Sequence, residues 1–238
     1  MPTPLSDDEP EQAREFFSYW VIFRKILEFN GLHHREAYAA IGQAFADHGR
    51  PFSLLDLGVG DGEWTVGALA GKSFSHYRAV DLSATALRLV EEYAVSLRGE
   101  KSFVQADLFD YLRESSDIFD IILIGLNLHH FPRGDKRQLL PKIRQLIAPG
   151  GRLLLFEAIS RPGETRGDTL LRWWEVVRVR WAALDPEELA KVRDHAFAYD
   201  YAESLETYAE MLAAAGFRES RVLFTDPDEL YAVIEAKV

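Results

Sequence analysis

Between residues 53 and 157 the sequence alternates between short apolar runs and longer amphipathic segments. The apolar runs are nearly continuous, as expected for strands buried on both faces, and the segments between them have helical spacing. The expected strands are Ser53–Leu57, Tyr77–Val80, Phe103–Gln105, Ile121–Ile124 and Leu153–Phe156. This alternation predicts an α/β protein, a Rossmann-like three-layer sandwich with a parallel sheet between two layers of helices.

The end of the chain adds two more expected strands, Arg221–Phe224 and Tyr231–Ala236. The turn that joins them, Asp226-Pro227-Asp228, is too short for a crossover connection, so the two strands are expected to be antiparallel neighbours. With the five runs before them, they predict a seven-stranded, mostly parallel sheet.

Two helical regions lie outside this pattern. Residues 1–48 are expected to form an N-terminal helical cap, and residues 49–238 the main domain, with a helical insertion at 161–200. Both regions are rich in aromatic side chains, which suits packing onto the sheet and also suits a lid over a site. As a lid, they would bring Tyr19, Phe23, Trp174 and His195 to a substrate.

Composition excludes several kinds of protein. The net charge of −11 disfavours binding to RNA or DNA, whose recognition usually needs a basic surface. There are no cysteines and no His-x-x-x-His spacing, so we expect no metal site. No run approaches the ~20 apolar residues of a membrane span, and the acidic start does not resemble a signal peptide, so a cytoplasmic enzyme is expected. The sequence leaves the oligomeric state open.

A glycine-rich turn directly follows the first expected strand. Gly58, Gly60 and Gly62 alternate with other residues and lead into a helix, which lets the backbone approach a ligand closely. The dinucleotide fingerprint needs its third glycine one position later, where this chain has Glu63, and no Gly-Lys-Ser/Thr follows for a P-loop. Asp56 would repel a pyrophosphate but suits the α-ammonium of a methionine moiety.

Acidic residues also follow the next two expected strands. Asp81 can accept hydrogen bonds from both hydroxyls of a ribose, and Asp107 can accept one from an adenine amino group. Either acid alone could simply cap a loop or a helix. Because the carboxyl ends of parallel strands share one edge of the sheet, we expect both acids beside the glycine turn.

Together these features resemble the class I S-adenosylmethionine-dependent methyltransferases, in particular their small-molecule branch. The resemblance covers about residues 53–157, where Leu146–Leu153 is similar to the family's turn into the fifth strand, and it returns at Gly216-Phe217 and the final strands. It implies that S-adenosyl-L-methionine is the cofactor and that the last strand is inserted antiparallel. The residues that it assigns to the cofactor are Asp56, Gly58, Val59, Gly60, Asp81, Leu82, Asp107, Leu108 and Asn127.

The exit of the fourth strand reads Asn127-Leu128-His129-His130, and in the family this loop lies beside the transferable methyl group. The Asn-Pro-Pro-Tyr motif of many nucleic-acid and protein amino methylases is absent. Histidine titrates near neutrality, so His129 and His130 are candidate catalytic bases, although neighbours in an extended segment point apart and only one should face the substrate. Glu157 ends the fifth strand at the same edge and could orient a donor.

The leading hypothesis is methyl transfer to an oxygen, nitrogen or carbon of a small molecule that carries a hydroxyl or amine. Methylation of a macromolecule, RNA or protein, is an alternative that retention on heparin would favour. A non-catalytic S-adenosylmethionine-binding partner protein is another, which tight cofactor binding without turnover would favour. A dehydrogenase is the weakest, and titration with NADH would reveal it.

Overall fold

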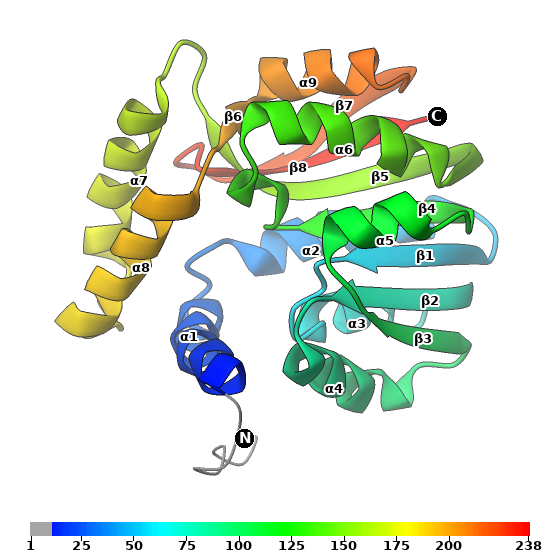
Figure 1. Cartoon of the computed structure of the whole chain (residues 1–238), viewed down its shortest axis with the longest axis horizontal. Helices are drawn as coiled ribbons and strands as arrows, with labels where there is room; N and C mark the ends of the chain where they lie inside the picture. The colour runs from blue at the N-terminus through cyan, green and yellow to red at the C-terminus, as the bar shows by residue number, and fades with distance from the viewer. Residues whose placement is uncertain (1–10) are drawn as a thin grey trace.

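The computed structural model describes residues 11–238, with side chains from Trp20 onward, and it contains the expected three-layer sandwich (Figure 1). Seven strands lie side by side in the order β3-β2-β1-β4-β5-β8-β7. Their bounds are β1 (Phe52–Leu57), β2 (Phe74–Asp81), β3 (Glu100–Gln105), β4 (Phe119–Gly125), β5 (Ile147–Ser160), β7 (Glu219–Thr225) and β8 (Tyr231–Lys237). The α/β fold class predicted from the apolar runs is confirmed.

The last strand, β8, is antiparallel to both of its neighbours, β5 and β7, as expected from the short turn before it. The strands β1 to β5 pair in parallel. One strand was not expected: the two-residue β6 (Glu203–Ser204) pairs in parallel with the end of β5. So short a segment carries no alternation that would reveal it in the sequence.

Helices cover both faces of the sheet. On one face lie α2 (His34–Ala46), α3 (Glu63–Leu69) and α4 (Ala84–Tyr93), the last continued by a 3-10 turn at Ala94–Ser96. On the other face lie α5 (Leu108–Glu114), α6 (Arg133–Gln145) and α9 (Leu205–Ala214). Because α2 packs against α3 and also contacts β7 and β8, part of the expected N-terminal cap belongs to the main layer.

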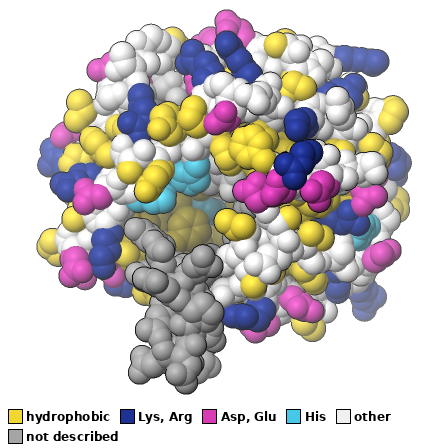
Figure 2. Space-filling model, in the orientation of Figure 1, with side chains coloured by type: hydrophobic (Ala, Val, Ile, Leu, Met, Phe, Trp, Pro, Cys, Tyr) yellow, Lys and Arg dark blue, Asp and Glu magenta, His cyan; other side chains and the backbone are white. Residues whose placement is uncertain are grey.

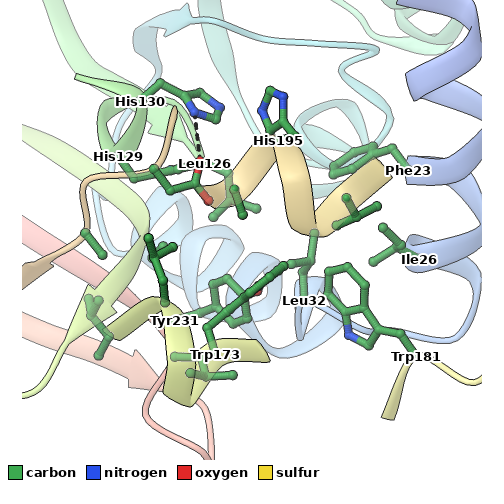
Figure 3. Close-up of a pocket in the computed structure, with 18 of the residues that line it drawn as sticks. Phe23, Ile26, Leu32, Leu126, His129, His130, Trp173, Trp181, His195 and Tyr231 are labelled. Carbon is green, nitrogen blue, oxygen red and sulfur yellow. Dashed lines mark hydrogen bonds and ion pairs between the residues drawn. The ribbon is translucent and has the colours of Figure 1, made fainter. Parts of the chain in front are cut away.

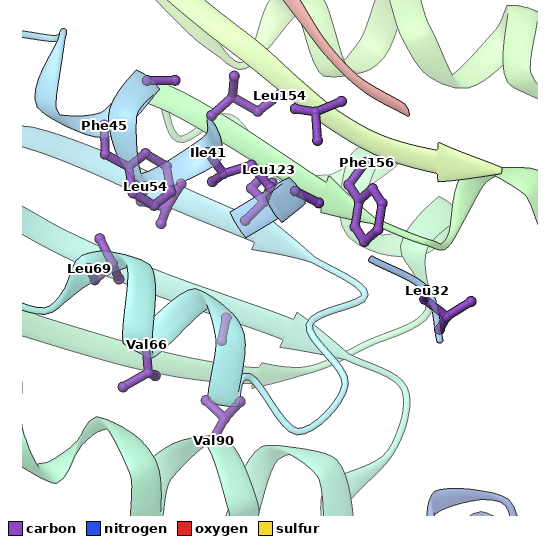
Figure 4. Packing of buried hydrophobic residues seen from close by; sticks show 14 of the residues in the cluster. Leu32, Ile41, Phe45, Leu54, Val66, Leu69, Val90, Leu123, Leu154 and Phe156 are labelled. Carbon is purple, nitrogen blue, oxygen red and sulfur yellow. The ribbon is translucent and has the colours of Figure 1, made fainter. Parts of the chain in front are cut away.

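Successive residues of the central strands point to opposite faces and so build two separate cores. Leu54 and Leu123 belong to the core under α2 and α3, together with Phe45 and Leu69 (Figure 4). Leu55 belongs to the core under α5, α6 and α9. This double burial explains why the strands read as continuous apolar runs.

Three further helices stand at the carboxyl edge of the parallel strands: α1 (Glu11–Glu28), α7 (Arg166–Arg180) and α8 (Pro186–Tyr199) (Figure 1). We call them the lid helices. The indole of Trp181, after α7, donates to the Gly31 carbonyl oxygen at 3.2 Å, and Lys25 of α1 pairs with Glu188 of α8. These contacts join α1 to α7 and α8, so the helices form one cover. Within residues 11–238, no helix has both the length and the apolar character to cross a bilayer.

Candidate active site

The glycine turn between β1 and α3 follows the end of β2 closely. Gly58, Gly60 and Gly62 all have positive φ, a conformation that other residues rarely adopt. The amides of Gly58 and Val59 donate to the Val80 carbonyl oxygen at 2.9 and 3.2 Å. A side chain on Gly58 would lie 2.4 Å from the Asn127 amide nitrogen, whereas one on Gly60 would meet nothing within 4 Å. The space in front of Gly60 is therefore open to a ligand.

Asp81 stands beside this open space. Its carboxylate accepts from the Gly60 amide at 2.9 Å and from the Ser83 amide at 2.8 Å, and burial raises its pKa. The next residue, Leu82, is apolar and exposes 68% of its surface. Asp107 is exposed and caps α5 through the amides of the first helical turn, which leaves its outer oxygen accessible.

Of the two acids near the turn, Asp61 lines the cavity, whereas Asp56, the acid expected to contact the cofactor, does not. Asp56 is buried beneath the turn, where it accepts from the hydroxyls of Tyr77 and Thr65, and burial raises its pKa to about 7. Asp61, which the sequence did not single out, lines the adjoining cavity and accepts from the Trp20 indole at 3.1 Å. Its place directly after Gly60 was the signal that could have identified it.

The loop after β4 is held by one buried carboxylate. Glu157, which has no exposed surface, accepts from the amides of Asn127, Leu128 and His129 at 3.2, 2.8 and 3.1 Å. It also accepts from His129 Nδ1 at 2.9 Å. Leu126, at φ 48°, turns the chain into this loop in a strained left-handed conformation, of the kind that accumulates at functional sites.

His129 is consequently fixed in one orientation. Its Nδ1–H is used by Glu157, so in the neutral ring Nε2 carries the lone pair, 3.9 Å from Asp200 Oδ1. Burial alone would lower the pKa of His129, but the hydrogen bond and charge of Glu157, with the charge of Asp200, outweigh it and raise the pKa. The arrangement is that of a base oriented by a carboxylate.

Two more histidines lie next to His129. The ring centroids of His129 and His130 are 4.1 Å apart, and His195 of α8 meets His130 edge to face at 5.4 Å. His130 Nδ1 is 3.2 Å from Asp200 Oδ1. Desolvation and the nearby His130 lower the pKa of His195. We call these three histidines, with Asp200, the histidine end.

A cavity of about 340 Å³ extends from the glycine turn to the histidine end and is lined in part by the lid helices. Its walls are mainly apolar: Phe23 and Ile26 come from α1, Trp173 from α7, and Tyr231 from β8, while the histidines gather at one end (Figure 3). Figure 2 shows histidine side chains within a hollow bordered by hydrophobic ones. A concave, mainly apolar cavity with a few polar groups at one end is typical of small-molecule sites.

Comparison with known proteins gives this arrangement a context. Residues 54–151 match the family described as methyltransferase domain. These residues form a class I methyltransferase domain. Domains of this class use S-adenosylmethionine, so the cofactor implied by the glycine turn and the acids is confirmed.

Among individual proteins, the domain is 29% identical over 134 residues to methyltransferase str2 of Strobilurus tenacellus, a match that covers 52% of this chain and 46% of that protein. The matched region thus spans about half the length of this curated relative. The fold is similar to that of 1,6-didemethyltoxoflavin-N1-methyltransferase of Burkholderia thailandensis, with a TM-score of 0.63, 21% identity, and coverage of 100% and 92% of the two chains. Magnesium protoporphyrin IX methyltransferase of Synechocystis also has a TM-score of 0.63, at 15% identity and 93% coverage of each chain.

The residues expected to contact an acceptor lie in different places. Phe23 and His195 line the cavity. Trp174 does not: its ring lies under the Arg193 guanidinium, and the neighbouring Trp173 faces the cavity instead, donating to the Tyr231 hydroxyl at 2.8 Å. Glu157 lies behind His129 rather than on the cavity wall, and the side chain of Tyr19 falls outside the described residues.

Proposed function

We propose that this chain transfers the methyl group of S-adenosylmethionine to a proton-bearing oxygen or nitrogen of a small, mostly apolar acceptor. The observation that carries the proposal is the orientation of His129. Its Nδ1 is held by Glu157, while the residue lines the same cavity as Gly60 of the glycine turn. Donor and acceptor bound at these two places would meet in front of a base.

The described residues fit the cofactor. The open space at Gly60 admits a backbone approach by the methionine moiety, and Asp81 offers a carboxylate to the ribose hydroxyls. Exposed Leu82 and half-buried Leu108 can cover the adenine, with Asp107 accepting from its amino group. Gly58, Val59 and Asn127 shape the turn, and Asp56 supports it from below.

Methyl transfer is an in-line displacement, so positioning and exclusion of water supply most of the rate. The bound cofactor contributes an electrophilic methyl group on a sulfonium. His129 Nε2 accepts the proton of the acceptor as the new bond forms, and Glu157 stabilises the imidazolium that results. The lid helices keep water from the reacting atoms.

The cavity favours an acceptor without negative charge. Apart from histidines, Arg166 is the cationic side chain among the described cavity-lining residues, and its guanidinium already donates to the carbonyl oxygens of Asp200 and Phe197 at 2.7 and 2.6 Å. Aromatic walls from Trp173 and Phe23 suit a planar molecule. Enclosure by the lid helices favours a small molecule over a nucleic acid or protein.

A two-part experiment tests the proposal. Calorimetry should detect S-adenosylhomocysteine binding at micromolar concentration, and formation of S-adenosylhomocysteine should then be measured across a panel of phenols, alcohols and aromatic amines. No binding would overturn the cofactor assignment. Binding without turnover of any acceptor would instead support a non-catalytic partner protein.

A further inference from the structure

We propose that His129, His130 and Asp200 bind one divalent transition-metal ion of the zinc type. The donor atoms are His129 Nε2, His130 Nδ1 and Asp200 Oδ1, which all lie within 4.8 Å of one another. Asp200 Oδ1 is 3.9 Å from the first and 3.2 Å from the second. Ligands of a tetrahedral zinc, each about 2.0–2.1 Å from the ion, are about 3.4 Å apart, so small side-chain rotations close the site.

The outer contacts of this site match those of known metal centres. A metal-binding histidine usually donates its other ring N–H to a carboxylate, which fixes the tautomer. Glu157 plays this part for His129, since it accepts from Nδ1 at 2.9 Å and thereby directs the Nε2 lone pair toward Asp200. Because Glu157 also holds three amides of the loop, the position of His129 is set before any ion arrives.

The remaining two donor atoms are buried and lack a hydrogen bond. Among the described residues, His130 Nδ1 and Asp200 Oδ1 form an ion-pair contact with each other at 3.2 Å, but neither atom has a hydrogen-bond partner. Leaving buried polar atoms unsatisfied is costly, and an ion between them removes that cost. Two histidines and one carboxylate leave at least one coordination position free, and the site faces the cavity.

A second group of potential ligands, His33, Asp226 and Asp228, provides the contrast. Asp226 accepts from the amides of Asp228, Leu230 and Tyr231, and so holds the turn between β7 and β8. Asp228 pairs with Arg180. Both carboxylates already have hydrogen-bond or ion-pair partners, so stabilisation of the turn accounts for this group without a metal ion.

Metal binding does not depend on the proposed function, but it affects it. Both the metal and the acceptor proton need the lone pair of His129 Nε2, so the two uses exclude each other. We therefore expect zinc to inhibit methyl transfer at concentrations that fill the site.

Titration of the whole chain with zinc alone, by calorimetry and by competition with a chromophoric chelator, tests the site. We expect one ion per chain, an affinity that falls as pH drops and the histidines become protonated, and a loss of about 100-fold or more in Asp200→Asn and in His130→Asn. Glu157→Gln, which leaves the three proposed ligands in place but alters the contact behind His129, should weaken binding by about 10–100-fold. Asp194→Asn, on the same helix as His195, and Asp228→Asn serve as controls and should bind normally.

Each variant is checked by circular dichroism and by S-adenosylhomocysteine binding, so a folding defect is recognised. Zinc binding that survives Asp200→Asn, or that is lost in Asp228→Asn, would overturn the assignment. Zinc that binds at the histidine end yet stimulates turnover would overturn the exclusion between metal and base. Because these titrations need no methyl acceptor, they remain informative if the proposed function fails.

Discussion

The glycine turn and the cavity that extends to the histidine end meet at Gly60, but they are built from different kinds of contact. The turn is built largely from backbone: amides of Gly58, Val59 and Gly60 bond to the end of β2 and to Asp81. The cavity is built from side chains of segments far apart in the chain, with Phe23 and Trp173 as examples. Substitutions at the turn should therefore change cofactor affinity, and substitutions at the cavity should change turnover or acceptor choice.

The largest expected effect separates the two regions most clearly. His129→Ala should lower turnover by about 10²–10⁴-fold, because it removes the base, while S-adenosylhomocysteine affinity stays within about twofold of the parent. Steady-state kinetics and calorimetry measure the two quantities. His76→Gln is the control, because His76 lies at the end of β2 away from Asp81. It should change neither turnover nor S-adenosylhomocysteine affinity. Full activity in His129→Ala would mean that transfer relies on proximity alone.

The converse pattern is expected at the turn. Asp81→Asn should weaken S-adenosylhomocysteine binding by about 1.5–3 kcal/mol, because charge-assisted hydrogen bonds to the ribose are lost. Turnover at saturating cofactor should remain close to that of the parent. Asp107→Asn, at an exposed helix cap, should have a smaller effect on affinity. Equal effects of the two substitutions would contradict the unequal burial of these acids beside the cofactor.

Glu157→Gln tests how the base is tuned. In the parent, Glu157 raises the pKa of His129 above its ordinary value of 6.5, and a base works only when unprotonated, so kcat/KM should rise with pH through that raised pKa. Without the charge of Glu157 the pKa should fall, and this limb should move to lower pH. If the pH dependence of kcat/KM is the same in Glu157→Gln as in the parent, a group other than His129 is responsible for it.

Two glycines offer a matched test of cofactor approach. Gly60 and Gly71 have φ values of 60° and 73°, and a side chain on either would meet nothing within 4 Å. Alanine should therefore cost each position a similar free energy of unfolding, about 1 kcal/mol. Only Gly60→Ala should also weaken S-adenosylhomocysteine, by about tenfold or 1.4 kcal/mol. Similar affinities in the two variants would place the cofactor elsewhere.

The smallest expected effect distinguishes two adjacent tryptophans. Trp173→Phe removes the hydrogen bond to Tyr231 and part of the cavity wall, so the acceptor KM should rise by a few-fold, about 0.5–1.5 kcal/mol. Trp174→Phe should leave KM unchanged, because this ring lies outside the cavity. The reverse result, measured with one acceptor in both variants, would mean that α7 turns in the complex.

Much of the fold could be predicted because its signals are local. Continuous apolar runs marked the strands buried on both faces, and the turn Asp226-Pro227-Asp228 required antiparallel neighbours. The pairing of β6 could not be foreseen, because Glu203–Ser204 is too short to show a pattern. Its position depends on where α8 ends.

The two sides of the candidate site differ in the same way. The cofactor side comes from a few contiguous residues at strand ends, and parallel pairing brings Asp56, Asp81 and Asp107 to one edge whatever the rest of the chain does. On the acceptor side, adjacent residues of a helix point about 100° apart. Which of Trp173 and Trp174 faces the cavity therefore depends on how α7 packs against Tyr231 and α8.

Local patterning was thus enough to specify the sheet and the glycine turn, because each rests on backbone geometry set by neighbouring residues. The class of cofactor followed from the family resemblance that these motifs carry. The histidine end is different. Glu157 reaches His129 because β4 and β5 are paired, and Asp200 reaches His130 because the lid helices fold back over the sheet. No spacing in the sequence predicts these contacts. They form because distant segments pack their apolar faces together, which also brings their polar side chains close to one another.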